Sequence, residues 1–230
     1  MKKLLFSLAL CTALFACDDD EKIEIKDYGM KSFEADLQYS STTDPESGYP
    51  MSTYAQQTYF AFGKDAAVAT GTVDTDSWTQ FNVFDEDAAD YNATSDVDGW
   101  DLVFTRYYGT TYDNDGNAVA YNLVGALHNI EKNMAVAEMM YEESTEADAI
   151  AQAFANMTIN DVESLSYNED IQTIGSDWKQ INSMYQYEVL TNKFYFIKLA
   201  DGTYYKLRFL SFYGASKDER IIKIEYALMQ

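Results

Sequence analysis

The chain has 230 residues, of which 47% are apolar and 15% aromatic, enough for a hydrophobic core and too many for a disordered chain. Its 38 acidic residues against 16 basic ones give a net charge of −22, which argues against nucleic-acid binding because phosphate contacts need a basic surface. With one histidine and none of the common zinc, phosphate-loop, dinucleotide or serine-hydrolase signatures, the sequence makes no case for an enzyme.

The N-terminus has the pattern of an export signal. Two lysines precede an apolar run over residues 4–16, which is too short to span a bilayer. The run ends in Leu14-Phe15-Ala16-Cys17, which resembles a bacterial lipobox. We therefore expect a lipoprotein signal peptide over residues 1–16 and acylation of Cys17; the alternative is an ordinary secretory signal cut near Ala16. Because Cys11 leaves with the signal, no disulfide is expected.

An acidic segment follows the signal. Asp18-Asp19-Asp20-Glu21 looks like the surface-export signal of some diderm bacteria, and the alternative is a plain solvated tether. Residues 17–31 lack a clear apolar period, so we expect an acidic tether there and a single domain over residues 32–230. The expected location is the outer membrane, with the lipid anchor holding the domain at the cell surface.

The domain reads as antiparallel β-structure. Apolar and polar residues alternate from Phe33 to Tyr39, and the polar cluster from Ser40 to Pro50 predicts a loop. Asp-Gly sequences at 115–116 and 201–202 predict hairpin turns, and the last three strands are predicted to form a meander. Further strands are predicted at Thr58–Phe62, Val68–Val73, Thr79–Phe84, Trp100–Tyr108, Val119–Leu127, Phe194–Leu199, Thr203–Tyr213 and Ile221–Leu228.

One helix is predicted after residue 145, where Ser144 or Thr145 can cap it. Ile150, Phe154 and Met157 share its apolar face, so the helix is expected to cover one patch of sheet. Residues 161–182 are less periodic and predict loop mixed with short strands. The expected fold class is all-β with one short helix, in a single antiparallel domain.

Acidic clusters are the first candidates for a metal site. Residues 74–76, 85–90 and 113–117 supply closely spaced carboxylates, which calcium prefers, but they lack the full spacing of a calcium loop. We interpret them as surface and turn residues. His128, at the end of an apolar strand, is either a surface or hydrogen-bonded strand-end histidine or a ligand.

Three segments resemble the HmuY family of haem-binding lipoproteins. They are Gly99-Trp-Asp-Leu-Val-Phe-Thr-Arg-Tyr107, the run from Phe194 to Tyr213, and Ile221-Ile-Lys-Ile-Glu-Tyr226. The resemblance implies an all-β fold that is anchored outside the outer membrane. It also implies a protein that captures haem, without chemical turnover, for a TonB-dependent transporter.

The resemblance also suggests iron ligands. Founding members of the family hold haem iron with two histidines, whereas this chain has one and so resembles members that use two methionines. Met184 falls near the family's second ligand, and we pair it with Met157; core packing is the alternative for each. Met134 and His128 are the reserves. Thioether ligands do not titrate near neutrality and favour ferrous haem.

Charge and motif residues complete the expectations. Lys132 or Lys179 is expected to pair with a haem propionate, since distant carboxylates are screened at physiological salt. Asp101 and Arg106 are expected to form a polar pair at a sheet edge, with Trp100, Leu102 and Phe104 on one strand face. The rival function is a haem-free binding module whose 19 tyrosines stack on glycans or pack against a transporter subunit.

Overall fold

The computed structural model describes residues 29–230 except 47, 49, 73–80 and 114. The predicted signal peptide, Cys17, most of the acidic tether and the cluster at 74–76 lie outside the described residues. The remainder is mostly antiparallel β-structure with one helix of ten residues, which confirms the predicted fold class.

The elements follow one another in a simple order. The early strands are β1 (Lys31–Asp36), β2 (Tyr39–Thr43), β3 (Pro50–Tyr54), β4 (Gln56–Ala61) and β5 (Ala66–Thr72). The long strands β6 (Leu102–Tyr112) and β7 (Ala118–His128) lead to β8 (Ala135–Met140), α1 (Ala147–Asn156) and α2 (Ile159–Val162). The chain ends with β9 (Lys179–Ile181), β10 (Tyr187–Val189), β11 (Lys193–Lys198), β12 (Tyr204–Ser211) and β13 (Ile221–Leu228).

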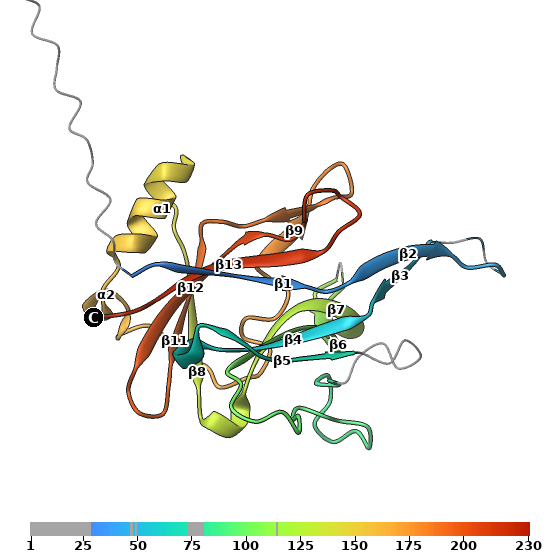
Figure 1. Ribbon diagram of the computed structural model, residues 1–230, viewed down its shortest axis with the longest axis horizontal. Coiled ribbons are helices and arrows are strands. Elements are labelled where there is room, and N and C mark those ends of the chain that lie inside the picture. Colours follow the sequence, from blue (N-terminus) through green and yellow to red (C-terminus); the bar gives the residue numbers. More distant parts are fainter. Residues whose placement is uncertain (1–28, 47, 49, 73–80, 114) are drawn as a thin grey trace, which may run out of the picture.

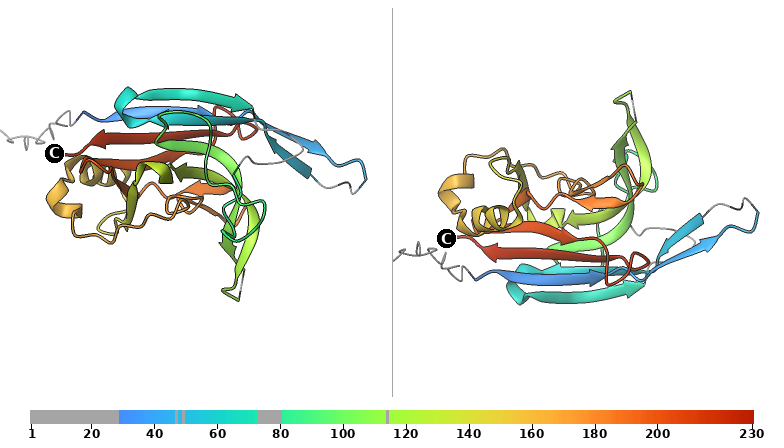
Figure 2. Two further views of the ribbon diagram at one scale, coloured as in Figure 1. Left: turned by 90° about the horizontal axis from the view of Figure 1, so that it is seen from below. Right: turned by 90° about the horizontal axis from the view of Figure 1, so that it is seen from above.

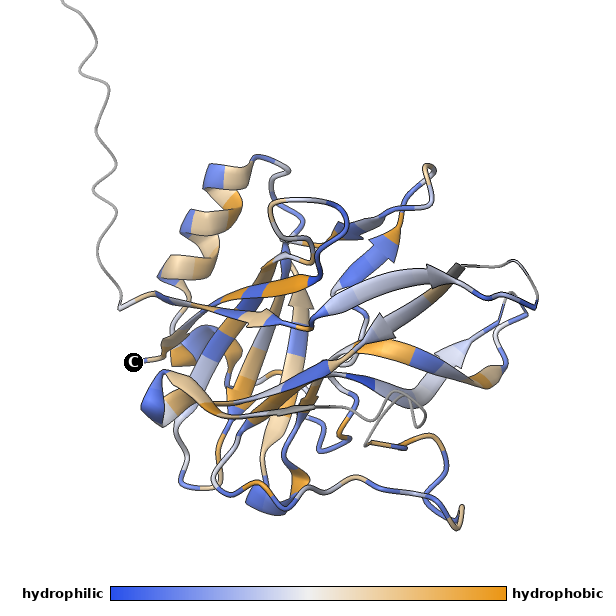
Figure 3. Ribbon diagram, turned by 45° about the vertical axis from the view of Figure 1, so that its right-hand side comes forward, coloured by the Kyte–Doolittle hydropathy of each residue, from blue (hydrophilic) through white to orange (hydrophobic). Residues whose placement is uncertain are grey.

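Two larger sheets share the main core. One has the strand order β1-β13-β12-β11-β8 and the other β5-β4-β6-β7. Aromatic rings join the sheets: Phe33 lies 4.7 Å from Phe60, and Phe62 stacks on Tyr205 at 4.4 Å between ring centroids. Orange, hydrophobic stretches in Figure 3 mark these strands. Burial of this apolar surface supplies most of the stability of the domain.

Strand alternation gives the five-stranded sheet a second apolar face. In β11, Tyr195 and Ile197 enter the shared core, whereas Phe194 and Phe196 face the other side. There α1 covers the sheet with Ile150 and Phe154, as its 3.6-residue period predicted. The helix ends at Asn156, and its C-terminal cap, Met157, is extended.

The meander and both hairpin turns are confirmed. Strands β11, β12 and β13 are neighbours in that order, with Gly202 in the first turn at φ +85°. Gly116, at φ +82°, lies in the turn between β6 and β7, where Asp113 Oδ1 accepts the backbone N–H groups of Asp115 and Asn117. Only glycine adopts such φ angles without strain.

Several expectations were wrong. The loop predicted from Ser40 to Pro50 is mostly a hairpin, because Thr and Ser side chains suit a solvent-exposed two-stranded ribbon. The described part of the strand expected at 79–84 forms only two isolated bridges, from Asn82 to Asn92 and to Tyr108. β8 and β10 were not predicted, whereas β9 is one of the short strands expected within residues 161–182.

Two hairpins project from one end of the molecule. β2–β3 extends beyond the sheets in Figure 1, and the outer half of β6–β7, where Thr110 pairs with Ala120, bends away from them in Figure 2. We call these hairpins the two arms. Helix α1 and the C-terminus lie at the opposite end. The pale colour of β2 and β3 in Figure 3 marks their weakly polar residues.

Candidate functional site

A cavity of about 730 Å³ lies where the two arms meet the β9–β10 hairpin. This volume is within the range of small-molecule sites in proteins. Both arms, the segment leading into β9 and the loop before β13 contribute to the wall, so residues distant in sequence meet here. The lining residues are Ser52, Tyr54, Arg106, Thr111, Tyr121, Asn122, Leu123, Val124, Ser176, Asp177, Lys179, Gln180, Ile181, Tyr187 and Arg220.

The floor of the cavity is fixed by a close approach of β7 to the segment before β9. Ala126 N–H donates to Gly175 O at 3.0 Å, and a Cβ on Gly125 would lie 1.9 Å from that same oxygen. Glycine at 125 is therefore required by the contact. Trp178 is anchored just beyond, donating to Gly175 O and stacking on Phe209 at 4.1 Å.

Three basic side chains line the cavity, and backbone carbonyls hold them. Arg106 donates to Ser52 O at 2.9 Å, and Lys179 donates to Val124 O. Arg220 Nη1 donates to Lys217 O and to Glu219 O, the latter at 3.2 Å, and its guanidinium carbon lies 4.1 Å from the centroid of the Tyr39 ring. The expected pair of Asp101 with Arg106 is therefore wrong: β6 is an inner strand, and Arg106 points to the β3 arm.

Burial sets the charge state of these groups and of the tyrosines beside them. It lowers the pKa of Lys179 to about 7 and that of Arg106 to about 10, because the charged forms lose hydration. It raises the pKa of Tyr54 to about 12, and the pKa of Tyr187 is raised by the same cause. At neutral pH Tyr54 and Tyr187 are therefore uncharged, and Arg106 is a cation.

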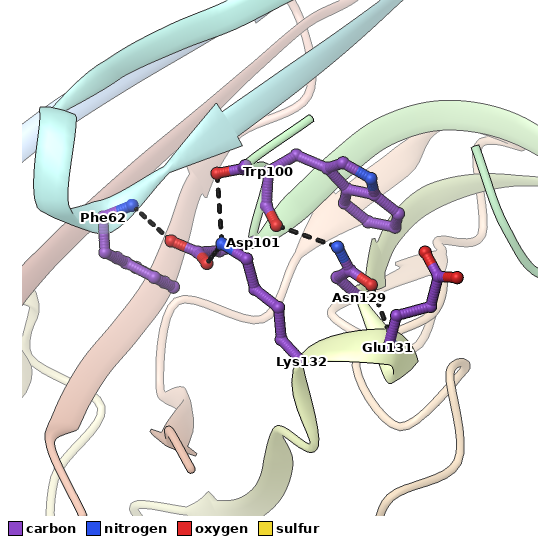
Figure 4. A network of polar contacts seen from close by, with 7 residues as sticks. Phe62, Trp100, Asp101, Asn129, Glu131 and Lys132 are labelled. Carbon is purple, nitrogen blue, oxygen red and sulfur yellow. Dashed lines mark hydrogen bonds and ion pairs between the residues drawn. The ribbon is translucent and has the colours of Figure 1, made fainter. Parts of the chain in front are cut away.

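Asp101 has a different role, which Figure 4 shows. Its carboxylate accepts Phe62 N–H at 2.8 Å and pairs with Lys132, which also donates to Gly99 O. Asn129 donates to Trp100 O at 3.0 Å. The Trp-Asp motif therefore ties β4 to the turn after β7 and belongs to the fold. Leu102 and Phe104 share one core cluster, as expected, but Trp100 packs in another, so the expected common face was wrong for Trp100.

Comparison with protein-family models gives a match over residues 53–226 to the model described as HmuY protein. The chain belongs to the HmuY family. HmuY proteins are a non-enzymatic, haem-binding family. No curated protein matches the chain.

Three solved bacterial structures are among those similar to this chain. A candidate lipoprotein from Bacteroides fragilis is 14% identical, with 87% of this chain and 90% of that chain covered and a TM-score of 0.45. A candidate HmuY-like haem-binding protein from Bacteroides vulgatus is 16% identical, with 86% and 91% covered and a TM-score of 0.41. The apo HmuY analogue of Tannerella forsythia is 11% identical, with 87% and 96% covered and a TM-score of 0.37.

Met184, the first ligand expected from the HmuY resemblance, lies in the turn between β9 and β10. The Asn182 side chain shapes that turn by accepting the N–H groups of Met184 and Gln186, and Tyr185 adopts φ +57°. Met184 is 68% exposed, so the core-packing alternative for it is wrong. The strands on either side of this turn line the cavity through Ile181 and Tyr187.

Met157 lies elsewhere. It packs beside the α1 cluster and lines a separate pocket of about 360 Å³ next to Lys206, which donates to Met157 O at 3.0 Å. Lys206 is near the start of β12, whereas Phe212, just past its end, contacts Tyr187 of the β9–β10 hairpin. Six residues of strand span about 20 Å, so the two sulfur atoms do not meet at one iron in this conformation.

The reserve ligands are inside the protein. Met134 is 1% exposed and packs in the core shared by the sheets. His128 is fully buried in β7, and neither ring nitrogen has a hydrogen-bond partner in good geometry, although the backbone of Glu169 lies near. The surface alternative for His128 is therefore wrong. Burial lowers the pKa of His128 to about 4.

Sequence reasoning placed only part of this site. It pointed to Lys179 and Met184, but not to Arg220 or to the wall formed by Tyr54 and Tyr187. Arg220 sits in an ordinary charged loop sequence, and no local pattern distinguishes it. Among the described residues, no group of three or more His, Cys, Asp or Glu side chains forms a metal site, and no helix is long and apolar enough to cross a membrane.

Proposed function

We propose that this protein binds haem in the cavity between the two arms, without chemical turnover. The observation that carries the proposal is a cavity of about 730 Å³ with aromatic walls and three basic side chains, in a chain of a haem-binding family. Haem is a flat, apolar ring with two carboxylates. Tyr54, Tyr187 and Leu123 offer surface to the ring, and the basic residues offer partners to the propionates.

Met184 is our proposed axial ligand. It is the exposed sulfur on the hairpin that lines the cavity, and a thioether is a soft ligand that suits haem iron. When bound, iron would supply a redox-active centre whose potential the sulfur raises. Met157 remains the proposed partner only if haem binding brings α1 and the β9–β10 turn together, since this conformation keeps them apart.

We further propose that Cys17 carries the lipid anchor and that the domain lies on the outer side of the outer membrane. The end of the domain that the tether joins would set how the domain faces. Gly29, where the tether meets the domain, lines the same pocket as the C-terminal Gln230, at the end opposite the arms. A domain tethered there would turn its cavity away from the membrane, toward incoming haem.

Delivery to a TonB-dependent transporter is the last part of the proposal. The rim of the cavity leaves large apolar side chains uncovered, with Tyr121 63% and Tyr185 93% exposed. Clustered exposed aromatics are typical of protein-binding surfaces. The same tyrosines favour the rival reading, a haem-free module that binds glycan or a transporter subunit. A haemin titration separates the two.

The experiment is a titration of the apo domain with haemin, followed in the visible spectrum. We expect a shifted Soret band that saturates near one haem per chain, and a protein that stays colourless would defeat haem binding and leave the rival. In the ferrous state, Met184→Ala should change the spectrum. The control is Met140→Ala, which removes an exposed methionine of β8 and should leave the spectrum unchanged. An unchanged Met184→Ala spectrum would remove sulfur ligation from that turn, and Met157→Ala tests the partner in the same way.

A further inference from the structure

We propose that the cavity recognises the carboxylates of its ligand through Arg106, Lys179 and Arg220, and therefore accepts a dicarboxylate porphyrin whether or not it carries iron. The inference rests on the proposed function, and it names the chemical groups of the ligand that decide binding. It predicts that the site selects an amphipathic ring with acidic side groups, with iron ligation as a secondary contribution.

The charged residues that line the cavity are mostly basic, whereas the chain as a whole is strongly acidic. Acidic residues outnumber basic ones by 38 to 16 in the whole sequence, whereas the cavity is lined by three basic residues and one acidic residue, Asp177. In a protein of net charge −22, clustered cations concentrate positive potential in one cleft. An anion is the ligand that such a cleft attracts.

Arg220 is the clearest of the three. Its guanidinium carbon lies 4.1 and 4.7 Å from the centroids of the Tyr39 and Tyr213 rings, and these contacts help to hold the side chain in place. Its Nε atom is buried and has no hydrogen-bond partner. In the part of the chain that the structure describes, Arg220 forms no ion pair with a carboxylate. Nη1 already donates to Lys217 O and Glu219 O, so a ligand carboxylate would meet the charge through the remaining N–H groups of the guanidinium.

Lys179 is positioned by aromatic rings. Its Nζ lies 4.4 Å from the Trp178 ring centroid and 5.1 Å from that of Phe212, and it donates to Val124 O. Rings and a carbonyl contact the amine without pairing it with a carboxylate, so its protonated form is available to an anion. Lys179 likewise forms no ion pair among the described residues.

Arg106 closes the arrangement from the other side. It extends from β6 toward the β3 arm, where it donates to Ser52 O and lies 5.8 Å from the Tyr54 ring. Tyr187 is within electrostatic range of both Arg106 and Arg220, and 5.5 Å from Lys179 Nζ. The three cations therefore surround one tyrosine wall, an arrangement suited to a flat ligand with carboxylates at its edge.

The lining itself contains no histidine, cysteine or methionine. Met184 is the sulfur that we propose as ligand, and one thioether is a weak ligand set compared with two imidazoles. Iron therefore finds few partners in the wall, while carboxylates find three. This contrast is the reason to expect metal-free protoporphyrin to bind with affinity within about tenfold of haemin.

The test compares three ligands on the intact wild-type domain: haemin, metal-free protoporphyrin and protoporphyrin dimethyl ester, in which the carboxylates are blocked. We expect the two acids to bind alike and the ester to bind at least about 30-fold more weakly, since charge-assisted contacts are lost. Quenching of tryptophan fluorescence reports all three. Because no variant is needed, a folding defect cannot explain the result.

Variants then assign the contacts. Arg220→Gln should weaken binding of protoporphyrin about tenfold and leave the affinity for the ester unchanged. Arg220→Lys should recover part of the loss. The matched control is Lys198→Gln, which replaces an exposed lysine of β11. Equal binding of the ester and the acid would overturn the inference while haem binding stands. Binding of haemin without metal-free protoporphyrin would also overturn it, in favour of iron ligation. Failure of every ligand would instead defeat the proposed function.

Discussion

The two ends of the five-stranded sheet differ in whether their large apolar side chains are buried within the chain. At the α1 end, Phe154 is fully buried, and Lys206 is satisfied by Ala155 O and Met157 O at 2.6 and 3.0 Å. At the arm end, large apolar side chains stay in solvent beside three cations. Among the described residues, seven of the ten exposed large apolar side chains lie there: Met51, Tyr112, Tyr121, Ile181, Met184, Tyr185 and Tyr187.

This difference separates folding from binding. The α1 end and the core beneath it bury their apolar surface within the chain, and that burial stabilises the domain. The rim leaves comparable surface uncovered, where it contributes nothing to folding until a ligand or a partner covers it. Substitutions in the core should therefore change stability, and substitutions at the rim should change binding.

The largest expected effect tests the core. Phe209→Ala removes a fully buried ring that stacks on Trp178 at 4.1 Å, and should lower the free energy of unfolding by about 3–5 kcal/mol. Tyr185→Ala removes a side chain that is 93% exposed and should change it by less than about 0.5 kcal/mol. Urea unfolding measures both. Similar losses for the two variants would mean that the rim also holds the fold together.

Acid should act on the core as well. Burial lowers the pKa of His128 from 6.5 to about 4, so between these pH values the unfolded chain binds a proton that the folded chain does not. Stability contributed by the neutral imidazole is therefore lost as pH falls through this window, by up to about 3 kcal/mol.

The comparison of wild type with His128→Leu isolates this contribution, because the carboxylates of the two proteins titrate alike. We expect unfolding free energies measured from pH 7 to pH 4 to fall more steeply for the wild type. Parallel curves would show that the imidazole keeps an ordinary pKa, and hence that the core around β7 admits water.

The same division explains what could be predicted from the sequence. The strands of the meander bury residues on a regular period, and their Asp-Gly turn is local, so β11 to β13 were predicted almost to their ends. α1 followed from its apolar stripe. In these elements, the local sequence period itself shows which residues are buried.

The cavity could not be predicted in this way. It depends on contacts between distant segments, such as Gly125 with Gly175 and Arg106 with Ser52, and no local period records them. Met184 was found only through resemblance to a family, and the partner chosen for it, Met157, followed a helix stripe that belongs to the other end of the molecule. Only the three-dimensional structure shows that these distant residues meet to form the cavity.

Gly125→Ala probes the boundary between the two regions. Its Cβ would lie 1.9 Å from the backbone oxygen of Gly175, which cannot give way as a side chain can, so the variant should lose about 1–3 kcal/mol of unfolding free energy. It should also weaken ligand binding, because the displaced segment carries Trp178 and Lys179. Gly63→Ala, whose Cβ meets nothing within 4 Å, is the control and should change neither quantity. A Gly125→Ala protein with normal stability and binding would show that this contact does not shape the cavity.

The smallest expected effect concerns the pH dependence of binding at the rim. Burial lowers the pKa of Lys179 to about 7, and a ligand carboxylate beside it would raise that pKa again. Binding is then favoured when Lys179 is protonated, so the dissociation constant for metal-free protoporphyrin should be flat below pH 6 and rise about tenfold between pH 6 and pH 8.

Lys179→Met removes the titrating group, and its affinity should be lower at pH 6 and constant across the same range. His128 does not interfere, because its pKa of about 4 lies below the window. If wild type and Lys179→Met change in parallel with pH, the ammonium does not meet the ligand, and the positive charge at the arm end would have to act through Arg106 and Arg220 alone. Fluorescence titrations at fixed ionic strength measure the affinity at each pH. A change between pH 6 and pH 8 can be assigned to Lys179, because arginine side chains stay charged over that range.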